Sequence, residues 1–330
     1  MLRHLLAIAV ILTVATGCDN VAWGGIEVSI ETPVRDSSAM DRVAGEAPVE
    51  AAPATPTGPL LLAGMRTGST VSLAPVGMLI DGRLTPLPAP ADTTAYRAVT
   101  DQLREGTGWV LFASGVRVGA ATVTGPASDP AACGPDLALT AVPQLLPAAT
   151  ATERFVALPA AEADAHPYDE YAPLDHNYNQ RVASLTLGAA AVPRVGATWP
   201  SGGMLETRRD MQAFRPRDAG WTSIAASFVI ADRLNTSAAA PGAYSLFLMA
   251  EERPTGFQET FVWYRSADEG KAAPRLFQHF DWDGDGADEV LLEVFGEGRR
   301  GWVALERADQ GSWEVSYRSA CPHVMEPAGG

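Results

Sequence analysis

The C-terminal third of the chain alternates short apolar runs with turn residues. From Trp221 onward, Gly, Pro, Asp and Asn separate runs of four to nine residues that are rich in aliphatic and aromatic side chains. The last run alternates Trp313, Val315 and Tyr317 with polar residues, a period of two that gives one buried and one solvent-facing side. Residues 221–321 are therefore predicted to form an antiparallel meander sheet. Its expected strands are 223–231, 244–250, 257–264, 276–280, 289–295, 302–306 and 313–317.

Residues 59–142 show a similar but weaker pattern. Alternating runs on either side of Asp81-Gly82 predict a hairpin, because this dipeptide favours the tight turns that connect paired strands. Residues 93–104 place apolar side chains three and four apart after Asp92, which predicts a short capped helix. Further strands are expected at 109–112 and 116–123. This segment is predicted to be a smaller β-rich unit.

The connection at 143–220 is expected to be irregular, with one helix near 176–190. The fold class that follows is mainly β: an antiparallel C-terminal meander sheet, a smaller β-rich N-terminal unit, and one or two short helices.

The first 17 residues have the three parts of a secretion signal. Arg3 and His4 precede an apolar run at 5–14, and small residues follow up to Cys18. The run is too short for a transmembrane helix, which needs about 20 residues. Ala15-Thr16-Gly17-Cys18 resembles the lipobox of bacterial lipoproteins, although that family more often has leucine where Ala15 stands. The resemblance implies cleavage before Cys18 and a diacylglycerol lipid on its thiol. An ordinary cleaved signal is the alternative.

A lipobox implies a protein of the bacterial cell envelope, attached to a membrane surface through the lipid on Cys18. Residues 18–58 are predicted to be a lipidated N-terminus and flexible linker, because 46–59 is rich in Ala, Pro, Glu and Thr with little to bury. Residues 322–330 are expected to be a short tail. No apolar stretch after the signal reaches transmembrane length.

The chain is strongly acidic, with a formal net charge of −15. Nucleic acid is not an expected partner, because phosphate contacts need clustered Lys and Arg. An anionic lipid surface should also repel the chain as a whole, so membrane attachment is expected to depend on the lipid.

Cysteine usage is consistent with export. With Cys18 lipidated, Cys133 and Cys321 remain, and an even pair in an oxidising compartment predicts one disulfide. Two buried free thiols are the alternative. A disulfide between these two positions would tie the N-terminal half to the last strand.

Residues 280–293 read F-D-W-D-G-D-G-A-D-E-V-L-L-E. Asp281, Asp283 and Asp285 alternate with residues that include Gly284, and glycine lets the backbone curl and direct three carboxylates to one point. Clustered carboxylates repel one another unless a cation neutralises them, and hard oxygen ligands suit Ca²⁺. A calcium site is therefore predicted here. An acidic hairpin turn without metal is the alternative, because Asp-Gly pairs favour such turns.

This loop resembles the calcium loops of FG-GAP and VCBS-type repeats, which run Asp-x-Asp-Gly-Asp-Gly-x-x-Asp into an apolar strand. The resemblance covers about fourteen residues and implies a loop, not a propeller. Glu289 stands where the family usually has aspartate. The expected ligands are Asp281, Asp283, Asp285, the Ala287 carbonyl and Glu289. An EF-hand does not fit, because its twelfth position would be Leu292 instead of glutamate.

Catalytic motifs are scarce. The chain has no Gly-x-Ser-x-Gly elbow, His-Glu-x-x-His pair or phosphate-binding loop. The polar stretch at 164–176, with two histidines and several acids, fits either a binding loop or a solvated surface loop. His279, just before the acidic loop, is expected to be packed or hydrogen-bonded.

The expected function is a non-catalytic binding or structural module with a structural calcium ion. A glycan or protein ligand is open. The alternative is an envelope hydrolase acting on glycans or peptides, which would need two facing carboxylates about 5–10 Å apart in a cleft.

Overall fold

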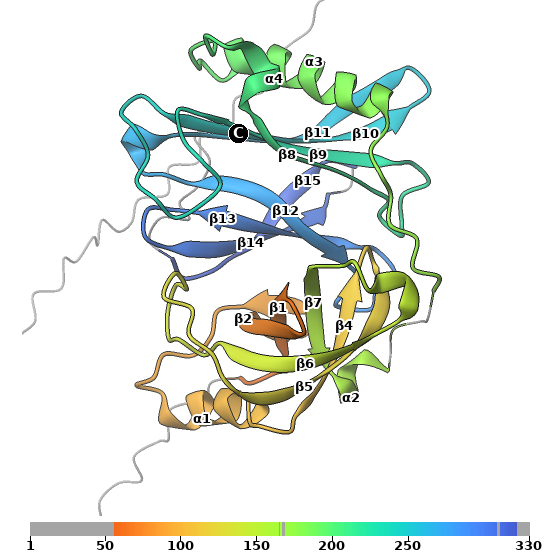
Figure 1. Ribbon diagram of the computed structural model, residues 1–330, viewed down its shortest axis with the longest axis vertical. Coiled ribbons are helices and arrows are strands. Elements are labelled where there is room, and N and C mark those ends of the chain that lie inside the picture. The colour runs from red at the N-terminus through yellow and green to blue at the C-terminus, as the bar shows by residue number, and fades with distance from the viewer. Residues whose placement is uncertain (1–55, 165, 167–168, 309–310, 322–330) are drawn as a thin grey trace, which may run out of the picture. The chain divides into compact units, whose positions relative to one another are not determined.

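The chain is built mainly of antiparallel strands, which confirms the predicted fold class. The computed structural model describes residues 56–321 except 165, 167–168 and 309–310 (Figure 1). The predicted signal peptide, Cys18, nearly all of the predicted linker at 18–58 and the tail at 322–330 lie outside the described residues. Among the helices in the described part, none has both the length and the apolar character needed to cross a bilayer.

Six N-terminal strands close into a barrel in the order β1-β7-β4-β5-β6-β2, because β2 also pairs with β1. The large apolar side chains of Leu62, Leu73, Trp109 and Phe155 fill its interior. A short strand β3 (Arg83–Thr85) extends the barrel from β2. The barrel strands are β1 (Leu60–Thr67), β2 (Thr70–Ile80), β4 (Gly108–Ala113), β5 (Val116–Pro126), β6 (Leu139–Leu145) and β7 (Arg154–Pro159).

Two local predictions for this unit are met. Helix α1 (Thr93–Gln102) begins after Asp92, whose side chain accepts a hydrogen bond from the backbone N–H of Ala95. Asp81 and Gly82 both have positive φ, 51° and 79°, as the tight turn between β2 and β3 requires. Short helical turns η1 (Pro147–Ala149) and α2 (Ala160–Ala163) flank β7.

The predicted C-terminal meander consists of two four-stranded sheets that pack face to face. Phe247 and Trp263 from the first sheet share a buried core with Leu292 and Leu305 from the second sheet. The first sheet holds β8 (Arg208–Phe214), β9 (Ser223–Ile230), β10 (Tyr244–Arg253) and β11 (Gly256–Ser266). After a short turn, η2 (Ala267–Glu269), the second holds β12 (Ala273–Phe280), β13 (Glu289–Phe295), β14 (Arg300–Arg307) and β15 (Trp313–Arg318).

Each sheet also buries its other face. Helices α3 (Tyr178–Arg194) and α4 (Gly203–Thr207) cover the first sheet (Figure 1). Met204 of α4 packs there with Phe228. The second sheet packs against the outside of the barrel, where Phe280 stacks on Phe112 with ring centroids 4.0 Å apart. Since barrel and sheet share this core, the loop that follows Phe280 is held from both sides.

The boundaries differ from those predicted. The barrel extends past residue 142 to β7. Residues 155–158 show no polar–apolar alternation because Phe155 and Ala157 face the barrel interior, whereas Val156 and Leu158 pack against the second sheet. The predicted connection at 143–220 also contains β8, whose polar composition hides its pairing with β9. The predicted helix at 176–190 is α3, which starts later because Asn177 and Gln180 form a capping box.

Cys133 and Cys321 form a disulfide, as the sequence predicts. It joins the loop between β5 and β6 to the end of β15, across 188 residues of chain. Arg300 strengthens the same junction, since its guanidinium pairs with Asp129 on the barrel side and with Glu293 on β13. The disulfide therefore links the barrel covalently to the second sheet.

Candidate metal site

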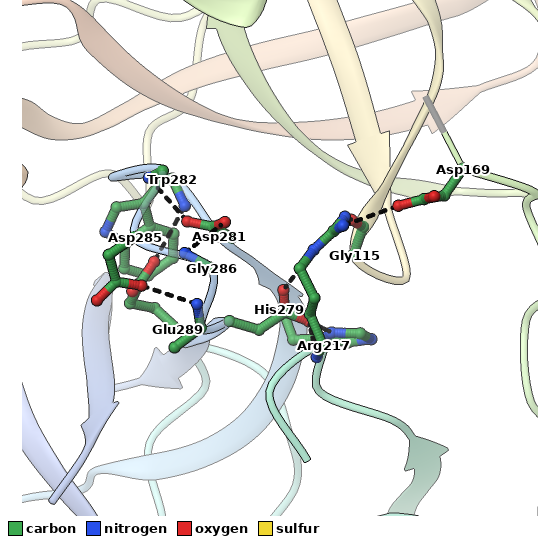
Figure 2. A network of polar contacts seen from close by, with 12 residues as sticks. Gly115, Asp169, Arg217, His279, Asp281, Trp282, Asp285, Gly286 and Glu289 are labelled. Atoms are coloured by element: carbon green, nitrogen blue, oxygen red, sulfur yellow. Dashed lines mark hydrogen bonds and ion pairs between the residues drawn. The ribbon is translucent and has the colours of Figure 1, made fainter. Parts of the chain in front are cut away.

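The acidic loop connects two strands of the second sheet. β12 ends at Phe280 and β13 begins at Glu289, so the loop lies where the sheet meets the barrel. Gly284 and Gly286 have φ values of 79° and 95°, in the region that side chains with a Cβ rarely adopt. These two glycines let the loop curl back on itself, as Figure 2 shows.

The curled loop gathers the three predicted aspartates. Asp281, Asp283 and Asp285 each offer a carboxylate oxygen, and these oxygens lie within 4.8 Å of one another. Calcium binds oxygen at 2.3–2.6 Å, so ligands on opposite sides of one ion lie about 5 Å apart. The spacing of the three oxygens fits a single calcium ion. Asp281 is buried, whereas Asp283 and Asp285 are exposed.

Backbone hydrogen bonds hold the carboxylates in place. Both oxygens of Asp281 accept N–H bonds, from Gly284 at 2.7 Å and Gly286 at 3.1 Å. Asp283 accepts from the N–H of Asp285 at 3.0 Å, and Asp285 accepts from that of Ala287 at 2.7 Å. A carboxylate has about four lone-pair sites, so each group keeps acceptor capacity for a cation. Ala287, the predicted carbonyl ligand, is half-buried beside them.

Glu289 is buried at the base of the loop, where its Oε2 accepts a hydrogen bond from the backbone N–H of Trp282 at 3.0 Å. The pKa of Glu289 is raised to about 9, mainly by burial and also by the nearby charges of Asp283, Asp281 and Asp285, whereas the Trp282 hydrogen bond lowers it. Burial also raises the pKa of Asp283. A bound cation would offset both effects, since it favours the charged carboxylates. The donor set therefore fits a hard divalent cation.

A pocket of about 260 Å³ lies beside the loop. It contains three acids, Asp283, Glu289 and Glu306, together with Arg83 from β3. The β2–β3 turn closes one side, because a Cβ at Gly82 would lie only 3.0 Å from the Cβ of Asp283. The barrel thus contributes to the surroundings of the predicted ligands.

The sequence prediction missed Asp288, which points away from the aspartate cluster. Its Oδ2 lies 2.6 Å from Nδ1 of His279 and also accepts the backbone N–H of Arg217 at 3.2 Å. Its Oδ1 has no hydrogen-bond partner among the described residues and lies 3.9 Å from Nε of Arg217. The sequence held one signal for this role: Asp288 stands directly before the apolar strand β13, where a carboxylate is expected to be buried and therefore to need a partner.

Arg217 joins this pair to two other segments (Figure 2). Its guanidinium donates to a carboxylate oxygen of Asp169 at 2.8 Å and to the carbonyl of Gly115 at 3.2 Å. His279 also packs its ring against Phe214, which confirms that this histidine is packed and hydrogen-bonded. The back of the loop is therefore braced against the β4–β5 turn and the 164–176 stretch.

The described residues of the 164–176 stretch do not assemble a second cluster of metal-binding side chains. His166 is buried against the rings of Phe112 and Phe280, and burial lowers its pKa. Asp175 and His176 are exposed. Asp169 pairs with Arg217 and Tyr171 hydrogen-bonds to Thr152, and most of the other described residues of this stretch are exposed.

One further pattern carries no site. Residues 296–301 read G-E-G-R-R-G, the spacing of a dinucleotide-binding fingerprint. They connect β13 to β14, two antiparallel strands, whereas the fingerprint needs a strand followed by a helix whose N-terminus binds phosphate. The pattern is therefore a coincidence of turn glycines.

Comparison of the chain with family models, with curated proteins and with solved structures found no match.

Proposed function

We propose that this chain is a lipid-anchored protein of the bacterial cell envelope, and that it serves as a non-catalytic binding or structural module with a structural calcium ion. The observation that carries the metal part is the loop at 281–289, where three aspartate oxygens lie within 4.8 Å of one another beside a buried glutamate. The proposed lipid anchor rests on the signal-like residues 1–17 and on Cys18, which follows them.

The role proposed for the ion is structural, because of where the loop lies. The loop joins β12 to β13, and both strands are buried between the first sheet and the barrel. Asp281, Asp283, Asp285, Glu289 and the carbonyl of Ala287 would hold the ion. Calcium supplies positive charge that offsets the repulsion among these acids, so binding should stabilise the folded loop.

Thermal unfolding of the chain from Asp19 onward tests the metal part, with millimolar calcium and with chelator. Extracellular calcium modules bind at roughly 10⁻⁴–10⁻³ M, so this concentration should add about 1 kcal/mol of stability. That corresponds to a rise in Tm of about 2–4 °C for a domain of this size. Asp283→Ala should abolish the rise, whereas Asp218→Ala, outside the loop, should keep it. If calcium does not change the Tm of the unsubstituted chain, the calcium site is contradicted and the loop is an acidic turn without metal.

Lipid attachment has its own test. Expression of the full chain in a bacterium with a radiolabelled fatty acid should label it and bring it into the membrane fraction. Cys18→Ala should lose the label. A labelled Cys18→Ala chain, or an unlabelled unsubstituted one, would contradict the lipid anchor.

A hydrolase acting on glycans or peptides is the competing function, and one observation favours it. Asp283, Glu289 and Glu306 line the same pocket of about 260 Å³, so acids share a concave surface. Paired carboxylates are the acid–base groups of glycosidases. Hydrolysis of cell-wall glycan or peptide substrates that is lost in Glu306→Gln but insensitive to chelator would favour this function over the calcium module.

A further inference from the structure

The two helices that cover the first sheet leave large apolar side chains in solvent. Trp199, in the segment between α3 and α4, is 54% exposed, and Leu205 on α4 is 64% exposed. Met204 and Thr207 of the same short helix are buried. The helix thus has an inner face that packs on the sheet and an outer face that presents a leucine to water.

A hydrogen bond and the pairing of the strands place Trp199 and Leu205 at one end of the first sheet. The hydroxyl of Tyr244 donates to the carbonyl of Thr198, next to Trp199, at 2.5 Å. Tyr244 pairs with Ile230 at the end of β9, so Trp199 lies near the loop that follows β9. Arg208 pairs with Phe228 at the same end, which brings α4 there too.

The same end carries a polar depression of about 470 Å³. Arg209, Arg233, Asn235 and Ser237 contribute its charged and hydrogen-bonding side chains, and both arginines are exposed. Its one acid, Asp232, is buried and paired with Lys271 at 2.7 Å, so it does not neutralise the arginines. Guanidinium, amide and hydroxyl donors together suit a phosphate group.

Two exposed arginines, Arg209 and Arg233, lie at this end of the sheet although the chain as a whole has a net charge of −15. Two of the acids at the same end are paired with other cations, Asp232 with Lys271 and Glu269 with Arg265. At physiological ionic strength the Debye length is about 8 Å, so a surface close to this end feels the local charge more than the distant acids.

From these observations we propose that the end of the first sheet formed by Trp199, Leu205, Arg209 and Arg233 docks on an anionic phospholipid membrane. Trp199 and Leu205 enter the interfacial layer, and the two arginines contact lipid phosphates. Tryptophan and arginine on either side of the headgroup level are the residue types that interfacial proteins use.

This inference extends the proposed lipid anchor, which would hold the chain near such a surface. A linker of the predicted length, 18–58, could span about 130 Å when extended, so anchorage alone leaves the orientation of the folded part open. Docking through this end would fix which side of the molecule faces the membrane and which faces away. It also means that the acidic chain is not repelled in every orientation, contrary to the expectation from net charge.

The test is flotation of the unlipidated chain, residues 19–330, with vesicles of phosphatidylcholine alone and with added phosphatidylglycerol. We expect binding to the anionic vesicles only, and weaker binding as salt is raised. Arg209→Glu combined with Arg233→Glu should lower affinity at least about ten-fold, since each basic group near such a surface contributes roughly a five-fold effect. Trp199→Ala should lower it by a similar factor. Because Cys18 is absent, the outcome is independent of lipid attachment.

Matched variants distinguish docking from general charge or hydrophobicity. Trp221, 40% exposed, precedes β9 at the opposite end of the first sheet, and Arg97 and Arg104 are exposed on the barrel. Trp221→Ala and Arg97→Glu with Arg104→Glu should leave vesicle binding unchanged. Equal losses in these controls, or no binding to anionic vesicles, would overturn the proposal. So would tight binding of free inorganic phosphate, or self-association lost in Trp199→Ala, without any vesicle binding.

Discussion

Nδ1 of His279 on β12 lies 2.6 Å from Oδ2 of Asp288 in the acidic loop, and both side chains are buried. Asp288 lies outside the aspartate cluster and contacts the barrel, because a Cβ on Gly115 in the β4–β5 turn would lie 3.0 Å from its Oδ2. The contact between Asp288 and His279 therefore holds one end of the loop against β12, while Asp281, Asp283 and Asp285 gather their carboxylates elsewhere in the loop.

We expect His279→Ala to lower the free energy of unfolding by about 3 kcal/mol, since it leaves a buried carboxylate with fewer partners. Chemical denaturation measures the loss directly. The exposed His176→Ala serves as the control and should change stability by less than about 0.5 kcal/mol. A double-mutant cycle with Asp288→Asn should show coupling of about 1 kcal/mol or more, and additive effects would mean that the two side chains do not depend on each other.

Glu289 offers a way to separate folding from calcium binding. Glu289→Gln keeps an oxygen that can accept the Trp282 N–H bond, and it stays neutral like the buried glutamate without calcium, but it cannot take on the negative charge that a bound cation would favour. Without calcium the variant should therefore unfold at nearly the same temperature as the unsubstituted chain. In calcium it should lose most of the expected rise in Tm. Differential scanning calorimetry with calcium and with chelator measures both, and an undiminished rise would remove Glu289 from the ligand set.

The disulfide should be the largest single contributor to stability. Its 188-residue separation gives roughly 5 kcal/mol in the chain-entropy model, although measured values often fall short. We expect Cys133→Ser combined with Cys321→Ser to lower the free energy of unfolding by about 3–5 kcal/mol. Each single variant should lose about as much as the pair, because either one breaks the bond. A double variant as stable as the unsubstituted chain would show that the shared apolar core and the Arg300 ion pairs hold the barrel to the sheet without the bond.

Sequence patterns predicted the elements whose signals are local. The hairpin turn at Asp81-Gly82 needs only two residues with positive φ, and the start of α1 needs only a capping side chain at Asp92. The acidic loop is local too, since Gly284 and Gly286 set its curl. These predictions required no knowledge of what lies across the fold.

The pairing of strands that are far apart in the sequence could not be predicted from local patterns. Closure of the barrel depends on β1 pairing with both β2 and β7, and the β7 residues 155–158 read only as a short apolar run. The partition of the C-terminal strands into two sheets depends on which faces meet, as Trp263 and Leu292 do in the shared core. Asp288 was missed for the same reason: its partners, His279 and Arg217, come from other segments.

Gly188 sets how closely α3 approaches the first sheet. A Cβ at this position would lie 2.8 Å from the ring of Phe228 and 2.9 Å from the terminal methyl of Met204. Alanine would gain about 1 kcal/mol of helix propensity, but the clash should cost about 1–3 kcal/mol. We therefore expect Gly188→Ala to lower the midpoint of urea unfolding, and to shift α4 with its exposed Leu205.

Gly108 is the matched control for this substitution. A Cβ added there would have open space for 4 Å around it, and the residue has no positive φ, so Gly108→Ala should be neutral or stabilise slightly. If Gly188→Ala instead raised the midpoint, the packing of α3 on Phe228 would have to be looser than the structure has it. The end of the sheet that carries α4 would then depend less on this packing. In that case Met204→Ala should leave the vesicle affinity unchanged.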